Sequence, residues 1–411
     1  MKRKSRAWYL SSGYKHLDVP VGETFAAETA NSDFVSSHSW LPLIKWVKRV
    51  KRYKPKVGQT VFKNRPIMYA SHRDACILKR YARELTAALD DHYAKSGLND
   101  AVIGYRKLGK ANYHFSADAH RFATATMPCK VLCFDITGFF DNLDHRILKD
   151  RLRRILAVKE LTQDWYQVFR AVTRYRAIER DHLEQHAVFG QRLAVMNRQP
   201  IATIAEIKAA GIVITPNPNK FGIPQGTPIS SAFSNLYLMD FDRVLLGACA
   251  AHGALYQRYS DDILIICPVG AEEGLSAVVQ KCLAEHHLML AADKSDEQLF
   301  DPNLFSEFQY LGFNISPDGA VIRQSSLARQ WRKVKRAIKN TRKAGLMAIS
   351  QGKANKIFVS KLRKRFSPVG ARNFSSYSRR AGEAFGSTKI ARQVSRLERR
   401  ADAAIRALQK L

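Results

Sequence analysis

The stretch LYQRYSDDILIICP, residues 255–268, places two adjacent aspartates, Asp261 and Asp262, between two runs of strand-forming residues. Aromatic and β-branched residues on both sides predict a β-hairpin over 254–268 with the aspartates at its turn. Two like charges beside an apolar strand repel each other and resist desolvation, so a bound divalent cation would stabilise them. Taken alone, the pair is better explained as an exposed hairpin turn.

A third carboxylate changes that interpretation. The stretch KVLCFDITGFFDNLDH (130–145) ends a predicted buried strand at Asp135, directly before a turn into a helix. From there Asp135 could meet Asp261 and Asp262 across neighbouring strands. Carboxylates placed in this way hold two metal ions about 3.5–4 Å apart in enzymes that displace phosphoryl groups in line. We expect two Mg2+ ions, with Mn2+ as an alternative, held by the three aspartates and the backbone of Ile136.

Between these stretches, GIPQGTPISSAFSNLYL (222–238) predicts a tight turn that opens a long helix over 228–248. Such a turn presents backbone N–H groups where a base pair or a phosphate can approach closely. The alternative is an ordinary loop followed by a helix N-cap. The order of an aspartate strand, this turn and a paired-aspartate hairpin favours the functional interpretation.

The charge of the chain points to a polyanionic partner. Lysine and arginine number 67 against 36 acidic residues, a formal net charge of +31, and the pI is near 10.1. Residues 321–411 hold 25 basic and 3 acidic residues, so 25 − 3 = +22 of this charge lies there. A basic run can be a solvated helix face, but this amount in one region favours a nucleic-acid-binding surface.

Two predicted helices of this region carry the candidate nucleic-acid-binding residues, which are Arg332, Lys333, Lys335, Arg336, Lys339, Lys361, Arg363, Lys364 and Arg365. The composition of 367–388 predicts a linker, and the last helix should dock through an apolar side.

Residues 40–53 show helical spacing of apolar residues and predict a basic helix. The six cysteines are scattered, and no apolar stretch suits a membrane span, so we expect a cytoplasmic protein without a membrane partner.

Taken in order, these motifs resemble the palm of reverse transcriptases, especially the bacterial retron, group II intron and abortive-infection enzymes. FDITGFFDNLDH is similar to the first catalytic motif, GIPQGTPISSAFSNLYL to the template- and nucleotide-contacting motif, and YSDD to the catalytic dyad. LAADKSD (290–296) is similar to the motif whose lysine faces the triphosphate, and FQYLGF (308–313) to the primer grip. RPIMYASHRDACI is similar to a fingers motif. The resemblance covers roughly residues 60–320.

This resemblance implies an α+β fold of the right-hand polymerase type, with fingers, a palm built on an antiparallel sheet with the YSDD hairpin, and a basic α-helical thumb. The expected divisions are a basic helical N-terminal extension (1–60), fingers and palm (61–320) and a basic helical thumb (321–411). Residues 162–220 are expected to be an insertion-like segment. That segment looks most like the defence-associated, unknown-group enzymes.

The resemblance also assigns residues by position. The residues expected to bind the nucleotide are Phe140, Gln225, Lys294, Arg65 and Lys63. Phe140 would stack under the incoming sugar and exclude a 2′-hydroxyl, which implies use of dNTPs; its alternative is a core phenylalanine. Arg65 and Lys63 could also be plain surface charges. The residues expected to form the primer grip are Tyr310, Leu311 and Gly312.

The implied function is an RNA-directed DNA polymerase in a prokaryote, acting in defence against phage with a dedicated structured noncoding RNA as template. Its partners would be that RNA, dNTPs and the RNA–DNA heteroduplex product; the sequence leaves the oligomeric state open. One alternative is untemplated synthesis primed from the protein itself, for which FSSYS (374–378) offers hydroxyl groups. Another is a maturase-like RNA-binding scaffold.

Overall fold

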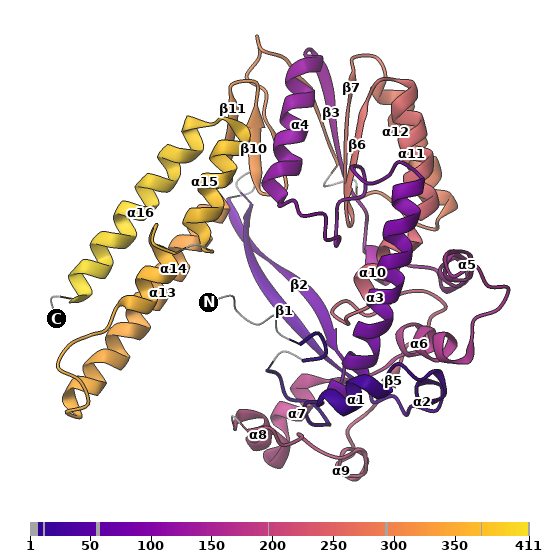
Figure 1. Cartoon of the computed structure of the whole chain (residues 1–411), viewed down its shortest axis with the longest axis vertical. Coiled ribbons are helices and arrows are strands. Elements are labelled where there is room, and N and C mark those ends of the chain that lie inside the picture. The colour runs from indigo at the N-terminus through magenta and orange to yellow at the C-terminus, as the bar shows by residue number, and fades with distance from the viewer. Residues whose placement is uncertain are drawn as a thin grey trace.

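The protein is described from a computed structural model covering residues 7–10, 13–54, 58–195, 197–291, 295–370 and 372–409, without the side chains of residues 52–54 and 63. Helices and strands are mixed along the chain, which confirms the predicted α+β class (Figure 1). The strands are β1 (Leu43–Lys54), β2 (Gln59–Tyr69), β3 (Cys129–Asp135), β4 (Arg176–Glu179), β5 (Thr215–Pro216), β6 (Leu255–Tyr259), β7 (Asp262–Pro268), β8 (Asp296–Phe300), β9 (Phe308–Tyr310), β10 (Phe313–Ser316) and β11 (Gly319–Ile322).

The helices are distributed over the whole described chain. They are α1 (Glu23–Glu28), α2 (Ser32–Ser36), α3 (His72–Lys95), α4 (Asn112–Thr126), the 3-10 helix η2 (Phe139–Asp141), α5 (His145–Ile155), α6 (Gln163–Thr173), α7 (Arg180–Gln185), α8 (Ala187–Ala194), α9 (Ile204–Ala209), α10 (Ser230–Tyr237), α11 (Met239–Ala251), α12 (Glu272–Glu285), α13 (Gln324–Ser350), α14 (Ser360–Phe366), α15 (Phe374–Phe385) and α16 (Thr388–Gln409).

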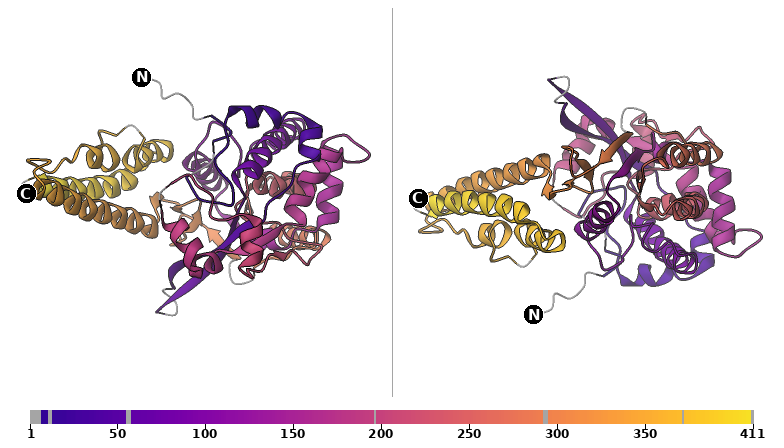
Figure 2. Two further views of the ribbon diagram at one scale, coloured as in Figure 1. Left: turned by 90° about the horizontal axis from the view of Figure 1, so that it is seen from below. Right: turned by 90° about the horizontal axis from the view of Figure 1, so that it is seen from above.

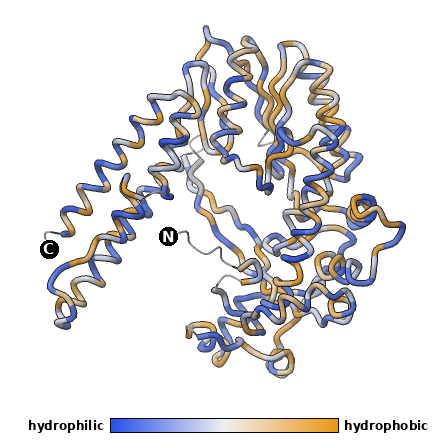
Figure 3. The backbone as a smooth tube through the Cα atoms, in the orientation of Figure 1, coloured by the Kyte–Doolittle hydropathy of each residue, from blue (hydrophilic) through white to orange (hydrophobic). Residues whose placement is uncertain are grey.

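A four-stranded sheet with the order β6-β7-β3-β8 contains the strands of the predicted aspartates, and we call it the central sheet. The strand β7 pairs antiparallel with both β6 and β3, so it lies inside the sheet. Side chains of alternate residues on β7 enter two separate cores: Ile263 and Ile265 pack in one, Leu264 and Ile266 in the other. Burial on both faces explains why this strand is a continuous apolar run rather than an alternating one. Figure 3 shows this apolar concentration along β7.

A smaller sheet, β11-β10-β9, shares the core on the α4 side of the central sheet. The C-terminal helices follow it, and Figures 1 and 2 both show α13, α14 and α16 extending away from the rest of the molecule. These helices have a small core of their own, which contains Val334, Leu362, Phe366 and Ile405 among other residues. The predicted docking of the last helix through an apolar side is confirmed, since Ile390, Val394, Ile405 and Leu408 are buried.

The predicted helix over 40–53 is wrong: residues 43–54 form β1 of a long hairpin with β2. The apolar spacing fits a helix, but Val, Trp and Tyr in this stretch also favour a strand. Pairing along the whole of β2 satisfies the backbone groups of β1, and at its base β1 also pairs in parallel with β4. Tertiary pairing therefore decides the structure here, and the hairpin joins residues on both sides of the predicted boundary at residue 60.

The predicted linker over 367–388 is also wrong for most of its length, because Phe374–Phe385 form α15. Its serine and glycine content suggested a loop. However, Phe374, Tyr377 and Ala381 recur at helical spacing, and they pack in the core that α4 shares. Asn373 caps the helix by accepting a hydrogen bond from the amide of Ser376.

The long helix predicted over 228–248 is divided into α10 and α11 at Leu238. The carbonyl of Tyr237, the last residue of α10, accepts a hydrogen bond from the buried guanidinium of Arg151 instead of continuing one helix. The segment 162–220 contains α6 to α9 and two short strands. Helix α6 packs in the large core, whereas α7, α8 and α9 share a small core with Leu17 and with Ile44 of β1. No described helix is long and apolar enough to span a membrane.

Candidate active site

The structure brings the three predicted aspartates to one end of the central sheet. Asp135, the last residue of β3, lies directly opposite Asp262, the first residue of β7. Residues opposite each other in an antiparallel pair have Cβ atoms about 4.5–5.5 Å apart. Asp261 is the neighbouring residue in the turn between β6 and β7, and its carbonyl accepts a hydrogen bond from the amide of Ile136 at 3.3 Å. We call residues 259–262 the aspartate turn.

Solvent reaches this end of the sheet. Asp135 and Asp261 are half-buried, and Asp262 is exposed. Cys133 points into the interior, where burial, with the charges of Asp296 and Asp262, raises the pKa of its thiol to about 12. Burial, with smaller effects of Cys133 and Asp262, also raises the pKa of Tyr310 well above its ordinary value. The raised pKa values keep the Cys133 thiol and the Tyr310 hydroxyl uncharged at neutral pH.

Carboxylate oxygens with room for water are the ligands that Mg2+ takes in nucleotidyl-transfer sites, so the donor types and their register fit the predicted ions. Among the residues that the structure describes, no three His, Cys, Asp or Glu side chains are already gathered as a ready-made metal site. The assignment of Asp135, Ile136, Asp261 and Asp262 as ligands stays a prediction.

The turn with Gln225 lies between the β1–β2 hairpin and η2. The carbonyl of Gln225 accepts a hydrogen bond from the amide of Met68 in β2 at 2.8 Å, and the amide of Ile223 donates to the carbonyl of Phe140 at 2.8 Å. Gly226 has φ +121°, and a Cβ there would lie 2.6 Å from the carbonyl oxygen of Met68, so only glycine fits. Three predicted motifs, far apart in sequence, thus meet beside the aspartates.

Comparison with known families agrees with this geometry. The family model of the reverse transcriptases (RNA-dependent DNA polymerases) matches residues 61–315. This chain belongs to the reverse transcriptase family. No curated protein sequence matches it.

Solved structures show a remote likeness to this chain. A telomerase from Candida tropicalis, truncated from its C-terminal domain, is 11% identical, with 66% of this chain and 52% of that chain covered and a TM-score of 0.43. A telomerase from Candida albicans in complex with a fragment of telomeric RNA is 10% identical, with 95% and 68% covered and a TM-score of 0.47. An RNA-dependent RNA polymerase of a human picobirnavirus is 12% identical, with 67% and 43% covered and a TM-score of 0.35. The chain spans about half the length of the two Candida tropicalis telomerase chains that it matches, 52% and 47%.

Phe139 and Phe140, the two phenylalanines after Asp135, have different surroundings. Phe139 is buried in the core, whereas Phe140 is half-buried and packs against it edge to face, with ring centroids 5.5 Å apart. Phe139 is therefore the core residue of the pair. Phe140 remains available for the predicted contact with the sugar.

The structure describes only some of the side chains that are predicted to bind the triphosphate. Arg65 lies on β2 opposite Lys48, and its side chain is exposed. Lys63 pairs with Val50 through its backbone, but its side chain lies outside the described part of the chain. Lys294 lies outside the described residues. The segment just before it is placed, however: the amide of Ala291 donates to the carbonyl of Asp135 at 2.8 Å.

The predicted primer grip is the turn between β9 and β10, where Leu311 (φ +43°) and Gly312 (φ +100°) both adopt left-handed conformations. Tyr310 is buried, and its hydroxyl donates to Oε1 of Gln257 in β6 at 3.1 Å. The side chain of Tyr310 therefore attaches the turn to the central sheet, and the turn itself is the part that can face a primer.

The nine predicted nucleic-acid-binding cations all lie exposed on α13 and α14. The apolar side of α13, with Val334, packs in the small core of the C-terminal helices. Each helix thus presents its cations to solvent, where they could reach a phosphate backbone.

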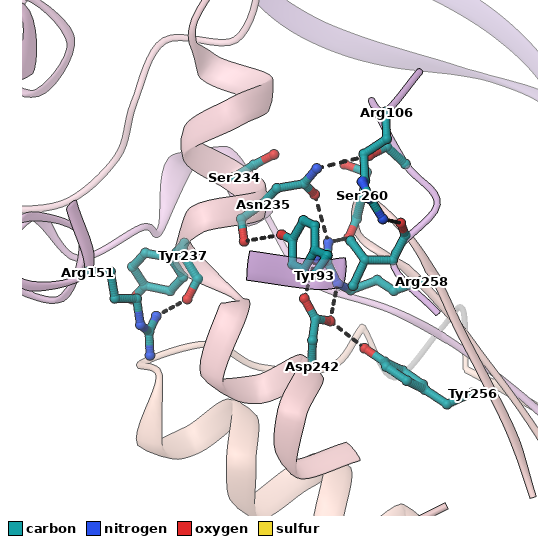
Figure 4. Close-up of polar contacts among 12 residues, drawn as sticks. Tyr93, Arg106, Arg151, Ser234, Asn235, Tyr237, Asp242, Tyr256, Arg258 and Ser260 are labelled. Carbon is teal, nitrogen blue, oxygen red and sulfur yellow. Dashed lines mark hydrogen bonds and ion pairs between the residues drawn. The ribbon is translucent and has the colours of Figure 1, made fainter. Parts of the chain in front are cut away.

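Sequence reasoning missed a buried polar cluster behind the aspartate turn (Figure 4). Arg258, three residues before Asp261, is completely buried, as is Asp242 of α11, and Asn235 of α10 is 3% exposed. Asn235 and Asp242 stand in the apolar helical pattern of 228–248, seven residues apart. Polar residues at core positions of a helix were the available signal, because buried polar groups require partners.

Proposed function

We propose that this chain is an RNA-directed DNA polymerase that adds dNTPs to a primer by two-metal-ion nucleotidyl transfer. The observation that carries the proposal is the register of Asp135 with Asp262, next to Asp261, in a chain of the reverse transcriptase family. When bound, two Mg2+ ions would lower the pKa of the primer 3′-hydroxyl and neutralise charge on the triphosphate and leaving pyrophosphate. Asp135, Asp261, Asp262 and the backbone of Ile136 would hold them.

The residues around the aspartates would bind and orient the other reactants. Phe140 would lie under the sugar, and Gln225 would contact the nucleotide or its template base. Arg65 and Lys294 would pair with triphosphate oxygens. The exposed cations of α13 and α14 would hold the RNA–DNA heteroduplex through its phosphates. Positioning of this kind supplies much of the barrier reduction in phosphoryl transfer.

The biological role that we propose is antiviral defence in a prokaryotic cytoplasm, with a dedicated structured noncoding RNA as template. Its support is the motif-level resemblance to the bacterial defence-associated enzymes. The net charge of +31 also suits a protein that stays bound to an RNA.

Protein-primed, untemplated synthesis receives no support from the stretch 374–378. This stretch lies in α15, with Ser375 and Ser378 buried. Tyr377 packs against Tyr113 of α4 with ring centroids 5.2 Å apart, and burial raises the pKa of its hydroxyl to about 12. A hydroxyl held in this way is a poor nucleophile.

The test is to sequence all RNA and DNA that copurify with the protein from its native locus, beside the Asp261→Ala/Asp262→Ala variant. We expect one discrete RNA in both samples and complementary DNA only in the wild type. DNA without complementarity to that RNA would instead indicate untemplated synthesis. RNA without DNA in both samples, before and during phage challenge, would contradict a polymerase and support the scaffold.

A further inference from the structure

Arg258 connects the hydrophobic interior to the aspartate turn. Its Nη1 donates to the carbonyl of Ser260 at 3.0 Å and to Oδ1 of Asn235 at 3.2 Å. Its Nε and Nη2 donate to the two carboxylate oxygens of Asp242, each at 2.6 Å. Figure 4 shows this guanidinium surrounded by the three partners. All three nitrogens are thus engaged, in the planar fork geometry that only arginine provides.

Stability alone gives little reason for this cluster. Removing two charges from water costs free energy that a buried ion pair often fails to recover, and apolar side chains of similar volume can stabilise a protein more. Arg258 and Asp242 are both 0% exposed. Burial opposes the charge of Arg258, but the adjacent Asp242 carboxylate outweighs it and keeps the pKa of Arg258 raised. Arg258 therefore keeps its charge in the interior at a cost in free energy, so the reason for the cluster is sought in its geometry.

The geometry that it holds is unusual. Ser260 has φ +63°, a left-handed conformation that is unfavourable for a residue with a Cβ. Two consecutive carbonyls of the turn are fixed, that of Ser260 by Arg258 and that of Asp261 by the amide of Ile136. The aspartate turn thus keeps a strained conformation because a buried donor behind it satisfies its carbonyl.

Residues 103–105 pack against the aspartate turn beside β6. The amides of Ile103 and Gly104 donate to the carbonyl of Arg258 at 3.0 and 3.3 Å, and Nδ2 of Asn235 donates to the carbonyl of Gly104 at 2.9 Å. A Cβ on Gly104 would lie 2.6 Å from the amide nitrogen of Ser260, so the segment touches the turn directly. Oγ of Ser260 also donates to the hydroxyl of Tyr105 at 3.3 Å.

The helix α10 extends this link to the turn with Gln225. The helix begins at Ser230, whose Oγ donates to the carbonyl of Pro224 at 2.6 Å, and its middle carries Asn235. One helix therefore fixes both the turn beside Phe140 and the donor group beneath the aspartate turn.

We propose that Arg258, held by Asp242 and Asn235, is a positioning residue that sets the place of Asp261 and Asp262 for metal binding. This inference rests on the proposed function. Replacing Arg258 should move the aspartates without removing any group that touches metal, nucleotide or nucleic acid. Mutation of a group that orients a metal ligand typically lowers metal affinity or activity 10- to 100-fold.

The test compares Arg258→Lys with Arg151→Lys. Arg151 is a matched control: it is also buried and also pairs with an aspartate of α11, Asp240 at 3.2 Å, but it reaches the carbonyl of Tyr237 and not the aspartate turn. We expect Arg258→Lys to lower kcat roughly 100-fold and to raise the half-saturating Mg2+ concentration roughly 10-fold. Affinity for the RNA–DNA heteroduplex should change less than about twofold. Arg151→Lys should lower Tm similarly and leave kcat and Mg2+ dependence near wild type. Equal Mg2+ dependence and kcat in the two variants would overturn the proposal.

If Arg258→Lys does not fold, two further variants test the positioning role. Gly104→Ala adds a methyl group against the turn and removes no polar group, so it should raise the half-saturating Mg2+ concentration in the same way. Tyr105→Phe changes a residue that is 46% exposed, so the fold should be kept, with a roughly threefold fall in kcat because one hydrogen bond to the turn is removed. Wild-type Mg2+ dependence and kcat in both variants would contradict the proposal.

Binding of Mn2+ alone, followed by electron paramagnetic resonance without nucleic acid, separates this inference from the proposed function. Weaker Mn2+ binding by Arg258→Lys than by Arg151→Lys supports the positioning role even where the wild type makes no DNA on RNA. Equal Mn2+ binding, in a wild type that does make DNA, would reject the positioning role and leave the polymerase intact.

Discussion

The buried Arg258 behind the aspartate turn and the exposed cations on the C-terminal helices contribute through different physical effects. Arg258 is fully buried and bonded to named acceptors, whereas the nine cations of α13 and α14 are exposed. An exposed cation near a phosphate backbone contributes through summed charge, which salt screens. A buried guanidinium contributes through fixed geometry, which salt barely affects. The comparison teaches that the number of basic residues in a segment predicts a nucleic-acid-binding surface, but does not identify the buried residue that positions the aspartates.

The largest expected effect comes from Asp135, which lies opposite Asp262 at the end of the central sheet. Asp135→Asn should lower DNA synthesis roughly 1,000-fold, because metal stabilisation of transition-state charge contributes several kcal/mol. Primer extension on a defined RNA template measures this, and filter binding of the same RNA should stay unchanged. Synthesis within tenfold of wild type would remove Asp135 from the metal site.

A smaller effect is expected at Phe140, half-buried beside the aspartates. Phe140→Ala should raise incorporation of rNTPs relative to dNTPs by about 10- to 100-fold, since a steric pocket discriminates to this extent. Competitive single-nucleotide insertion measures the ratio. An unchanged ratio would make Phe140 a core residue only.

Substitution of the exposed cations should change nucleic-acid binding and its salt dependence, in contrast to substitution of Arg258. Changing Arg332, Lys335, Arg336 and Lys339 together to glutamine should weaken heteroduplex binding about tenfold at 0.15 M salt. The slope of log K against log salt should fall by up to about 3 to 4, near 0.9 for each phosphate that is no longer neutralised. Fluorescence anisotropy over a salt series measures both. The half-saturating Mg2+ concentration should not change, and a shift in it would break the distinction between the two regions.

The smallest expected effect concerns Asp240, the half-buried counterpart of Asp242. Burial opposes its charge, but hydrogen bonds and charges of Arg154 and Arg151 lower the pKa of Asp240 to about 2. A carboxylate with a lowered folded-state pKa stabilises the fold above its unfolded pKa, and this stability is lost as pH falls toward 2. We expect Asp240→Asn to remove on the order of 1 kcal/mol at pH 6, since partial exposure screens the pair, and nothing near pH 2. Urea unfolding at several pH values measures this; a pH-independent difference would contradict it.

The sequence predicted the palm motifs because their signals are local. The strand of Asp135 and the hairpin of Asp261 and Asp262 follow from apolar runs and turn residues over a few residues. The same local rules mistook 40–53 for a helix and 374–385 for a linker. In those two places, strand pairing with β2 and packing on α4 outweigh propensity and composition.

By itself, the sequence determined the family and the concentration of cations in the C-terminal region, and it predicted the three metal-binding aspartates, since residue type and order carry each of these signals. Only the tertiary structure decided that Asp135 stands opposite Asp262, that Gln225 meets β2 and Phe140, and that Arg258 supports the aspartate turn. The physical reason is that these are contacts between residues distant in sequence. Their energy depends on burial and on exact hydrogen-bond geometry, and neither exists until the sheet and helices have packed.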